Sequence, residues 1–296
     1  MTMPGEALTP EAIRVALTTR WLGRPTTVFD AIPSTNNWLA EQAATGAPHG
    51  ALAIADVQTA GRGRMGRTWQ SPPGAGLLFS LLFRPPATVT PGQVGLAAAA
   101  GVAVALSGPP PSPPSTEGSE RVEPFMREVS SLPPPAGGWG GLEARLKWPN
   151  DVLIGGKKVA GLLGDASFRD GRPEWVIVGI GLNVNLAPAD FPAAPPGGAT
   201  PTSLLAQLGR PVERAPLLAA ILAAIEPRYE ALVAGEAQAG EWRRLSATVG
   251  QPVRVTGGMA VEGVAVDIAA DGSLLVRQAD GSVVSVAAGD VSLRPV

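Results

Sequence analysis

The sequence predicts an α+β fold, in which a mixed sheet with flanking helices is followed by a small C-terminal antiparallel β-barrel. In the first part of the chain, strand candidates and helix candidates follow one another without the regular alternation of a doubly wound sheet. From about Gly250 onward, short strand candidates alternate with tight-turn signals such as Asp271-Gly272 and Asp280-Gly281, which is typical of a small barrel. We therefore expect a first domain over residues 1–248 and a barrel domain over residues 249–296.

Apolar periodicity and capping residues assign the elements of the first domain. Ser34 or Thr35 is suited to cap the helix that carries Trp38 and Leu39, because a hydroxyl there accepts a hydrogen bond from a first-turn N–H. Further helices are expected over Pro10–Trp21, Gln93–Leu106 and Ala215–Val233. Strands are expected over Val28–Ile32, Ala51–Val57, Leu77–Phe83, Arg145–Ile154, Lys158–Ser167 and Trp175–Val184, with a tight turn at Gly155-Gly156.

One segment of the first domain does not fit this pattern. Residues 107–141 are crowded with Pro, Gly and Ser, and include Pro109-Pro110-Pro111 and Pro133-Pro134-Pro135. Proline lacks the N–H that a helix or a central strand needs, and the segment has few apolar groups to offset the entropy lost on ordering. We expect a disordered surface insertion.

The composition excludes several classes of site. The chain of 296 residues has no cysteine and a single histidine, His49, which excludes disulfides, thiolate chemistry and any metal site built from several histidines. The formal net charge of −2 offers no broad basic face for nucleic acid. No apolar stretch approaches the ~20 residues that a membrane span needs, and no signal peptide is visible, so a cytoplasmic protein is expected.

The segment Gly61–Arg67, Gly-Arg-Gly-Arg-Met-Gly-Arg, matches the dinucleotide fingerprint G-x-G-x-x-G by its letters alone. That fingerprint requires a helix directly after it and an acidic residue ~20 positions on. Here the chain continues into Pro72-Pro73-Gly74, which cannot be helical, and no Asp or Glu occurs between Val57 and Thr116. The Gly-Lys-Ser/Thr ending of a P-loop is also missing, so neither nucleotide motif applies.

What remains is a glycine-rich loop with arginines at 62, 64 and 67 and no acidic neighbour in sequence. Arginine grips a carboxylate or a phosphate with two hydrogen bonds, and glycine lets a ligand approach the backbone closely. The loop therefore predicts an anion site. On composition alone, a solvated basic loop or a nonspecific nucleic-acid patch fits equally well.

Five motifs in one order resemble those of the biotin–protein ligases. They are Ser34-Thr35-Asn36, Gln58–Trp69, Lys147-Trp148-Pro149-Asn150-Asp151, Lys158–Leu163 and Gly179–Val184. The resemblance covers most of residues 28–186. It implies the biotin/lipoate ligase catalytic fold with an SH3-like C-terminal barrel. It also implies synthesis of biotinyl-5'-AMP from biotin and ATP with Mg²⁺, followed by transfer of biotin to a lysine of a biotin carboxyl carrier protein.

The resemblance also implies a role for each residue that matches a motif. Lys158, Arg62 and Arg64 would be catalytic. The residues expected to bind biotin are Ser34, Thr35, Asn36, Gln58, Gly61, Arg62, Gly63, Arg64, Lys158, Gly161 and Gly179. Those expected to bind ATP are Trp69, Asn150, Asp151 and Asn183, with Asp151 as a candidate ligand of Mg²⁺.

Simpler roles remain open for several of these residues. Ser34 and Thr35 would serve as a plain helix cap, and the Pro149 to Asp151 segment as a plain turn. Glycine weakens a strand unless something approaches it closely, and bound biotin is our candidate for that neighbour at Gly161 and Gly179. In a strand, neighbouring side chains point to opposite faces, so only one of Lys157 and Lys158 can enter the site.

Two further functions must be weighed against a biotin ligase. A lipoate–protein ligase would share the fold and the adenylate chemistry, and a nonenzymatic module would use the barrel to bind nucleic acid. Acidic residues in the barrel oppose nucleic-acid binding. Because only about 27 residues precede the first strand, fewer than a DNA-binding domain needs, we expect the ligase-only type, with no DNA partner. A homodimer is left open.

Overall fold

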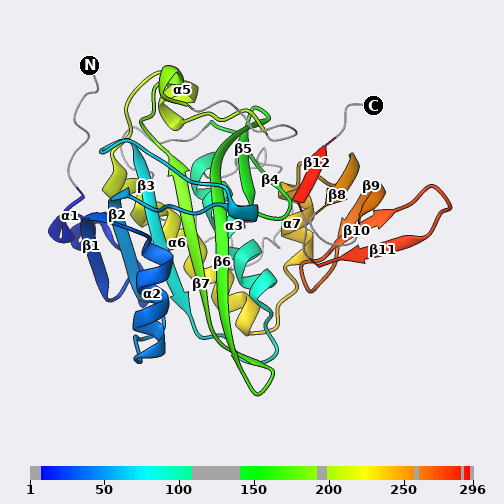
Figure 1. The fold of residues 1–296 in the computed structure, drawn as a ribbon, viewed down its shortest axis with the longest axis horizontal. Helices are drawn as coiled ribbons and strands as arrows, with labels where there is room; N and C mark the ends of the chain where they lie inside the picture. Colours follow the sequence, from blue (N-terminus) through cyan, green and yellow to red (C-terminus); the bar gives the residue numbers. More distant parts are fainter. Residues whose placement is uncertain (1–7, 109–140, 192–198, 257–259, 288–289, 294–296) are drawn as a thin grey trace, which may run out of the picture.

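The computed structural model describes residues 8–108, 141–191, 199–256, 260–287 and 290–293 (Figure 1). A seven-stranded mixed sheet flanked by helices lies beside a smaller antiparallel sheet near the C-terminus (Figure 1). This arrangement confirms the α+β class. No helix in these ranges is long and apolar enough to cross a membrane.

The large sheet has the strand order β1-β2-β3-β7-β6-β5-β4. Its strands are β1 (Thr26–Ile32), β2 (Leu52–Gln58), β3 (Gly76–Phe83), β4 (Ala144–Lys147), β5 (Asp151–Ile154), β6 (Lys157–Arg169) and β7 (Arg172–Asn183). β1 and β2 are parallel, and every other neighbouring pair is antiparallel. β3 is buried along its whole length, as its apolar run, interrupted only by Ser80, predicts for a strand covered on both faces.

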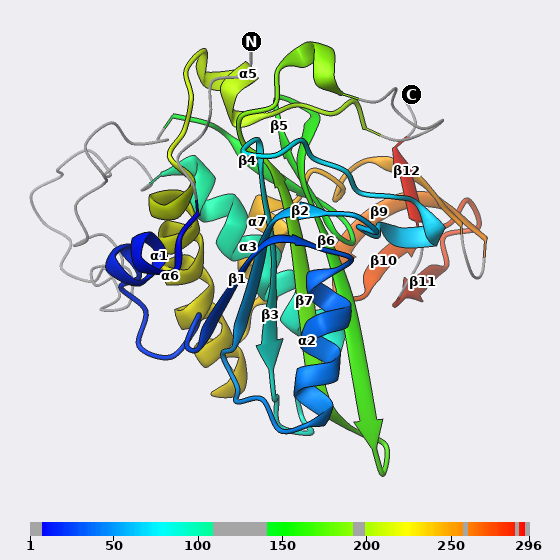
Figure 2. The ribbon, with the colours of Figure 1, turned by 60° about the vertical axis from the view of Figure 1, so that its left-hand side comes forward.

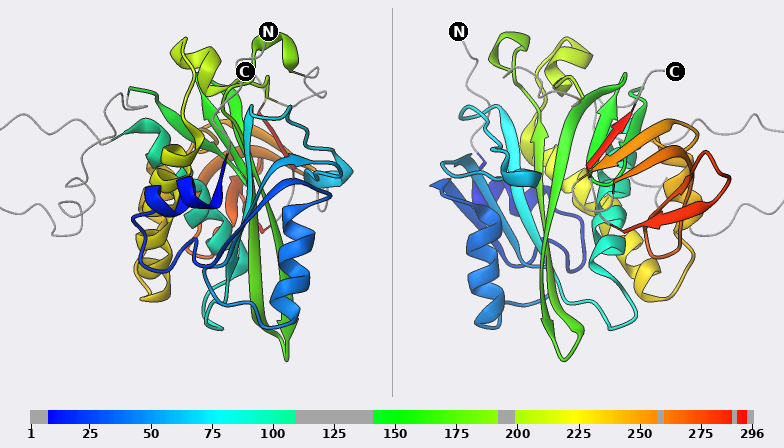
Figure 3. Two further views of the ribbon diagram at one scale, coloured as in Figure 1. Left: turned by 90° about the vertical axis from the view of Figure 1, so that its left-hand side faces the viewer. Right: turned by 45° about the vertical axis from the view of Figure 1, so that its right-hand side comes forward.

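Helices cover both faces of this sheet (Figures 2 and 3). α3 (Pro91–Ser107) and α6 (Arg214–Val233) pack together on one face, with α1 (Pro10–Ala16) against α6. The two helices approach closely because α3 is rich in alanine and carries Gly101, where a Cβ would overlap with Ile225. α2 (Thr35–Ala44) lies alone on the opposite face, against β2, β3 and β7.

Several predicted boundaries were wrong. The single strand expected over Arg145–Ile154 is an antiparallel hairpin, β4 and β5, and its turn is formed by Trp148, Pro149 and Asn150. Proline has no N–H to donate to a ladder, which explains why the chain turns there.

The first helix ends at Ala16 rather than Trp21 because tertiary contacts outweigh helix propensity. The N–H groups of Arg20 and Trp21 donate to the carboxylate of Glu226 on α6. Two short helices were not predicted, α5 (Leu204–Leu208) and α7 (Ala239–Leu245). α3 continues to Ser107, and residues 109–140 of the expected insertion lie outside the described residues.

The C-terminal sheet is antiparallel, in the order β11-β10-β9-β8-β12. Its strands are β8 (Pro252–Thr256), β9 (Val261–Ile268), β10 (Leu274–Arg277), β11 (Val283–Val286) and β12 (Asp290–Leu293). The end strands β11 and β12 are not paired with each other within the described part of the chain, so the antiparallel sheet is confirmed and the closed barrel is not.

Trp148 joins this sheet to the large one. Its indole Nε1 donates to the carbonyl of Gly272 at 3.0 Å, and its backbone N–H donates to Thr248 at 2.9 Å. Gln93, in the first turn of α3, donates to the carbonyl of Ala270. Core residues from both sheets belong to one buried cluster, so the small sheet has a fixed position beside the large one.

Candidate active site

A cavity of about 330 Å³ opens where the N-terminus of α2, strands β6 and β7 and the β2–β3 connection meet. We call residues 59–75 of this connection the ligand loop. All the residues that the motifs implicate except Gly61 line the cavity, although they come from distant parts of the sequence. These residues are Ser34, Thr35, Asn36, Gln58, Arg62, Gly63, Arg64, Trp69, Asn150, Asp151, Lys158, Gly161, Gly179 and Asn183.

One end of the cavity is neutral and polar. Ser34 caps α2 by accepting a hydrogen bond from the N–H of Asn37, so the helix-cap role is present. The amide oxygen Oε1 of Gln58 accepts the N–H of Thr35 at 2.8 Å, which satisfies a second unpaired donor of the same helix end. Because both caps also line the cavity, capping and ligand contact are compatible.

Asn36 lies over Gly179 in the middle of the sheet. In β7, Gly179 is paired with Ser80 of β3 on one side and Leu163 of β6 on the other. The Asn36 side chain reaches both neighbours, since its Nδ2 donates to the Leu163 carbonyl and its Oδ1 accepts from the Ser80 hydroxyl. A Cβ at Gly179 would overlap with the Asn36 amide. The close approach predicted at this glycine is therefore made by a protein side chain.

Trp69 has the same relation to Gly161 and Gly181. These glycines are register partners in β6 and β7, and a Cβ on either would press into the indole ring. The indole thus lies flat on a sheet surface that two glycines leave open. Its Nε1–H is buried and has no hydrogen-bond partner among the described residues.

The ligand loop folds back on itself. The N–H of Gly63 donates to the carbonyl of Arg67 at 2.7 Å, and the N–H of Trp69 donates to the carbonyl of Gly61 at 2.9 Å. Gly61 faces the Trp69 carbonyl so closely that a Cβ would overlap with it. At the tip, Met65 is exposed and has φ 55°, in the left-handed region that L residues rarely adopt. No helix of the dinucleotide type follows this loop.

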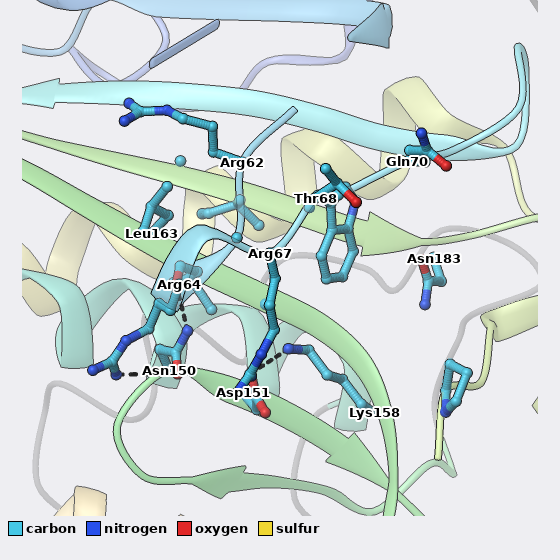
Figure 4. Close-up of a pocket in the computed structure, with 18 of the residues that line it drawn as sticks. Arg62, Arg64, Arg67, Thr68, Gln70, Asn150, Asp151, Lys158, Leu163 and Asn183 are labelled. Carbon is cyan, nitrogen blue, oxygen red and sulfur yellow. Dashed lines mark hydrogen bonds and ion pairs between the residues drawn. The ribbon is translucent and has the colours of Figure 1, made fainter. Parts of the chain in front are cut away.

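The arginines of the loop point in different directions (Figure 4). Arg62 points away from Lys158 and donates to the Asn37 side chain at 2.7 Å and to Asp165 at 3.1 Å. Arg64 reaches the amide oxygen of Asn150, and Arg67 points toward Asp151. Of the two arginines expected to be catalytic with Lys158, Arg62 therefore points away from the lysine, and Arg67 lies nearer to it.

Lys158 enters the cavity, while the neighbouring Lys157 is exposed to solvent. The Lys158 ammonium pairs with Asp151 Oδ1 at 2.5 Å, and the two side chains are only 25% and 15% exposed. It also lies 5.4 Å from the centre of the Trp69 ring. The carboxylate and Arg67 give this end of the cavity a charged character that the α2 end lacks.

The remaining polar residues frame the charged end. Asn150 donates to the Leu162 carbonyl at 2.7 Å, and Asn183 donates to the Thr202 carbonyl at 2.9 Å. Both side chains are therefore held in place by strand backbone. Among the described residues no three His, Cys, Asp or Glu side chains gather to hold a metal ion. Asp151 is a single carboxylate at the edge of the cavity. One carboxylate is a sufficient protein ligand for a Mg²⁺ ion whose other ligands are mainly phosphate oxygens.

His49 takes no part in the site. Its Nδ1 accepts the N–H of Arg84, and its ring stacks on Trp21 with 4.3 Å between centroids. Burial, together with the charge of Arg84, lowers the pKa of His49. The single histidine is thus a neutral packing residue, and a hydrolase that depends on it has no support.

Sequence reasoning missed several residues around the cavity. Arg67 was visible in the loop motif but received no role. Asp165 and Ser80 lie behind the lining, and the only hint of Asp165 was a charge inside a predicted strand. Thr256 and Val291 of the small sheet line the cavity, and no local pattern in the sequence pointed to them.

Comparisons with known proteins agree with this geometry. Residues 28–183 match the model of the Biotin/lipoate A/B protein ligase family, and residues 248–294 match the Biotin protein ligase C terminal domain. The Biotin--[acetyl-CoA-carboxylase] ligase of Mycobacterium tuberculosis is 35% identical over 263 residues, which are 87% of this chain and 85% of that protein. The Bifunctional ligase/repressor BirA of Bacillus subtilis is 37% identical over 228 residues, 76% of this chain. The match spans 60% of the length of the Bacillus protein.

A solved structure gives the same result for the fold. The biotin protein ligase from Aquifex aeolicus in complex with biotin and ATP matches with a TM-score of 0.68 and 26% sequence identity. The match covers 92% of this chain and 100% of that one. The first family model alone spans more than half of the chain, and it includes the α2 N-terminus, the ligand loop and strands β5 to β7. The chain therefore belongs to the Biotin/lipoate A/B protein ligase family.

Proposed function

We propose that this protein is an ATP-dependent biotin–protein ligase, which forms biotinyl-5'-AMP and then transfers biotin to a lysine of a biotin carboxyl carrier protein. The observation that carries the proposal is one cavity with a neutral polar end and a charged end, joined by a stretch of sheet where the Trp69 indole covers Gly161 and Gly181. Biotin has a neutral ureido head, which suits the neutral end, and a carboxylate at the far end of its tail, which suits the charged end.

The neutral end would hold the ureido head. Thr35 and Gln58 lie side by side there, and Ser34 and Asn36 complete the wall. Hydroxyl and amide groups suit a urea, which both donates and accepts hydrogen bonds. Gly63 would give the ligand room along the loop, while Gly61 and Gly161 make space for Trp69 and Gly179 makes space for Asn36 in the wall of the site.

The charged end would carry out the first reaction. An oxygen of the biotin carboxylate attacks the α-phosphorus of ATP, a new P–O bond forms, and pyrophosphate leaves. Two anions must meet, so the main requirement is cationic stabilisation at fixed positions. Lys158 and Arg64 supply it, and we add Arg67 because it points toward the same corner. Arg62 would act from the biotin side of the loop.

The nucleotide would lie against Trp69, Asn150, Asp151 and Asn183. Asp151 would help to hold Mg²⁺, which would offset phosphate charge. Asp151 pairs with Lys158, and bound phosphates would give both groups further partners. In the second reaction the acceptor amine attacks the biotinyl carbonyl, loses a proton, and AMP leaves. Both steps need water to be excluded, and closure of the ligand loop would provide this.

The domain organisation belongs to the same proposal. Residues 1–248 would form the catalytic domain, and residues 249–296 an SH3-like barrel domain. Thr256 and Val291 line the cavity, which supports a role for that domain in completing the site.

The net charge of −2 supports a ligase that does not bind DNA. Sedimentation in the presence and absence of biotin and ATP tests the homodimer.

One assay tests the activity. The protein is incubated with ATP and labelled biotin or labelled lipoate, with and without a biotin carboxyl carrier domain. With ATP and labelled biotin, but not with labelled lipoate, we expect a labelled acyl-adenylate. When the carrier domain is added, we expect the label on its lysine. Preference for lipoate would replace the proposal with the lipoate ligase, and the absence of any adenylate would favour a binding module.

A further inference from the structure

A chain of polar side chains leads from Asp165 on β6, behind the cavity, to Gln58 at its neutral end. Asn36 Nδ2 donates to Asp165 Oδ2 at 2.8 Å, and Asn36 Oδ1 accepts from the Ser80 hydroxyl at 2.5 Å. The Ser80 and Thr35 hydroxyl oxygens are 2.7 Å apart, and the Thr35 hydroxyl is 3.2 Å from Gln58 Oε1. Thr35, Asn36 and Ser80 are buried, so each hydrogen bond matters for the stability of the site.

Asp165, together with the Leu163 carbonyl, sets the direction of the hydrogen bonds from Asn36 to Ser80 and on to Thr35. A carboxylate only accepts hydrogen bonds, and so does the Leu163 carbonyl, so the Asn36 amide must turn its NH₂ group to both. Its oxygen then faces Ser80, which must donate its one hydroxyl proton to it. The Ser80 oxygen can therefore only accept from Thr35, and the Thr35 proton is committed within the protein, to Ser80 or to Gln58.

This fixed direction has a consequence at the cavity wall. With its proton committed, the Thr35 hydroxyl can offer a ligand only a lone pair. Gln58 turns its oxygen to Thr35, so its NH₂ group is the part left for a ligand. The wall presents an acceptor and a donor in fixed positions, which is the complement of a cyclic urea with its ring N–H and its carbonyl.

We propose that Asp165 is a positioning residue that sets the donor and acceptor pattern of the ureido site through Asn36, Ser80 and Thr35. This inference rests on the proposed function, since it assigns the recognition of biotin's ring N–H to the Thr35 oxygen. Asp165 does not line the cavity, so its effect on a ligand must pass through the side chains that it binds.

The same carboxylate oxygen also binds the ligand loop. Arg62 donates to Asp165 Oδ2, and its guanidinium also reaches the Asn37 side chain. The Arg62 guanidinium therefore shares one carboxylate oxygen with the Asn36 amide. One side chain therefore links the ureido end of the site to the anchoring of the loop.

The test uses Asp165→Asn, which keeps the shape of the side chain but can turn a donor or an acceptor toward Asn36. Asp170→Asn is the matched control, because Asp170 lies on the β6–β7 turn, is exposed, and has a left-handed φ that asparagine tolerates. Calorimetry measures the Kd of biotin and of two biotins N-methylated at one or the other ureido nitrogen. Thermal unfolding checks that each variant is folded.

We expect Asp165→Asn to raise the Kd of biotin about tenfold. This is the size expected when a charge-assisted hydrogen bond, here from Asn36 to the carboxylate, is lost and the side chains beyond it no longer keep one orientation. The decisive readout is the ratio of the Kd of methylated biotin to that of biotin. When the methyl group is on the nitrogen that faces Thr35, this ratio should be at least about threefold lower in Asp165→Asn than in the wild type. The reason is that the Thr35 oxygen of the variant no longer favours a ligand N–H over a methylated nitrogen. Asp170→Asn leaves both values unchanged.

Three results would overturn the inference. An unchanged biotin Kd in Asp165→Asn shows that the carboxylate does not set the pattern. Weaker binding with an unchanged methylation ratio shows that Asp165 only supports the loop, and Arg62→Met should then reproduce the same loss. If the wild-type protein does not bind biotin, the proposed function falls together with this inference, whereas the first two results leave the proposed function intact.

Discussion

The floor of the cavity and the ligand loop are built in different ways. The floor consists of β6, β7 and the first turn of α2, and its polar side chains are tied to backbone or to buried partners. The loop is fixed by a few backbone bonds and by the long side chains of Arg62 and Arg64. The polar side chains of the floor therefore have fixed positions. Most of the positive charge of the site lies instead on loop arginines, whose long side chains can change partners.

The largest effect is expected from Lys158, the cation of strand β6 that enters the cavity. Lys158→Ala removes the ammonium beside Asp151 and leaves that carboxylate facing the incoming phosphates. We expect biotinyl-adenylate formation to fall about 10²- to 10³-fold, as for the loss of one preorganised charge. Lys157→Ala, on the exposed side of the same strand, is the control. Normal biotinylation of a carrier domain by Lys158→Ala would refute the assignment.

The next test concerns the fixed end of the loop. Arg214 on α6 is 2% exposed, pairs with Asp56 at 2.5 Å and donates to the Gly76 carbonyl, while Asp56 accepts the N–H of Gly74. Arg214→Ala leaves Asp56 without its cation. Because Asp56 is 30% exposed, we expect a loss of about 2–3 kcal/mol rather than the full cost of breaking a buried pair.

Urea unfolding measures this loss, and protease cleavage in residues 59–75 should become faster. Arg14→Ala breaks an exposed pair with Glu11 and should change stability by less than about 0.5 kcal/mol. If Arg214→Ala and Arg14→Ala lost the same stability, the end of the ligand loop at Gly74 would not depend on Arg214.

The floor can be tested through a single methyl group. In Gly179→Ala the new Cβ overlaps with the Asn36 amide, which cannot turn aside without breaking bonds to Leu163, Ser80 and Asp165. We expect a destabilisation of about 2 kcal/mol, typical of overpacking, and weaker biotin binding. In Gly164→Ala, on the adjacent strand, the methyl group meets nothing within 4 Å and should have little effect on either measurement.

The smallest effect is expected at the tip of the loop. Met65 has φ 55°, which asparagine tolerates better than methionine and a β-branched residue tolerates worst. Met65→Asn should slow protease cleavage of the loop by a stabilisation of up to about 1 kcal/mol, and Met65→Val should accelerate it. Identical cleavage rates would indicate that the loop does not keep this backbone shape in solution.

The floor was also the more predictable part from sequence. Alternation indicated that only one of Lys157 and Lys158 enters the site, and the resemblance selected Lys158, which lines the cavity. The cap was predicted as Ser34 or Thr35, and it is Ser34. Glycine in a strand indicated a close neighbour at 161 and 179, but the sequence could not reveal that the neighbours are Trp69 and Asn36, because these contacts join segments far apart in the chain.

Loop geometry and tertiary pairing escaped prediction. A run of glycines and arginines does not state where each side chain points, so the turn of Arg62 toward Asp165 was missed. The hairpin at Trp148-Pro149-Asn150 was taken for one strand because its residues are apolar on both sides of the turn. Strand register and side-chain partners depend on the whole fold, which local patterns do not encode.

The position of Trp69 has an optical consequence. Its indole lies against two strand glycines with a lysine ammonium 5.4 Å from its ring. Trp148 also lines the cavity, whereas Trp242 is fully buried and does not. Indole emission responds to nearby charge and to solvent, so filling the cavity should change the fluorescence of Trp69 most strongly. The protein thus carries its own optical reporter, and Trp69→Phe should remove most of the signal, with any remainder assigned to Trp148.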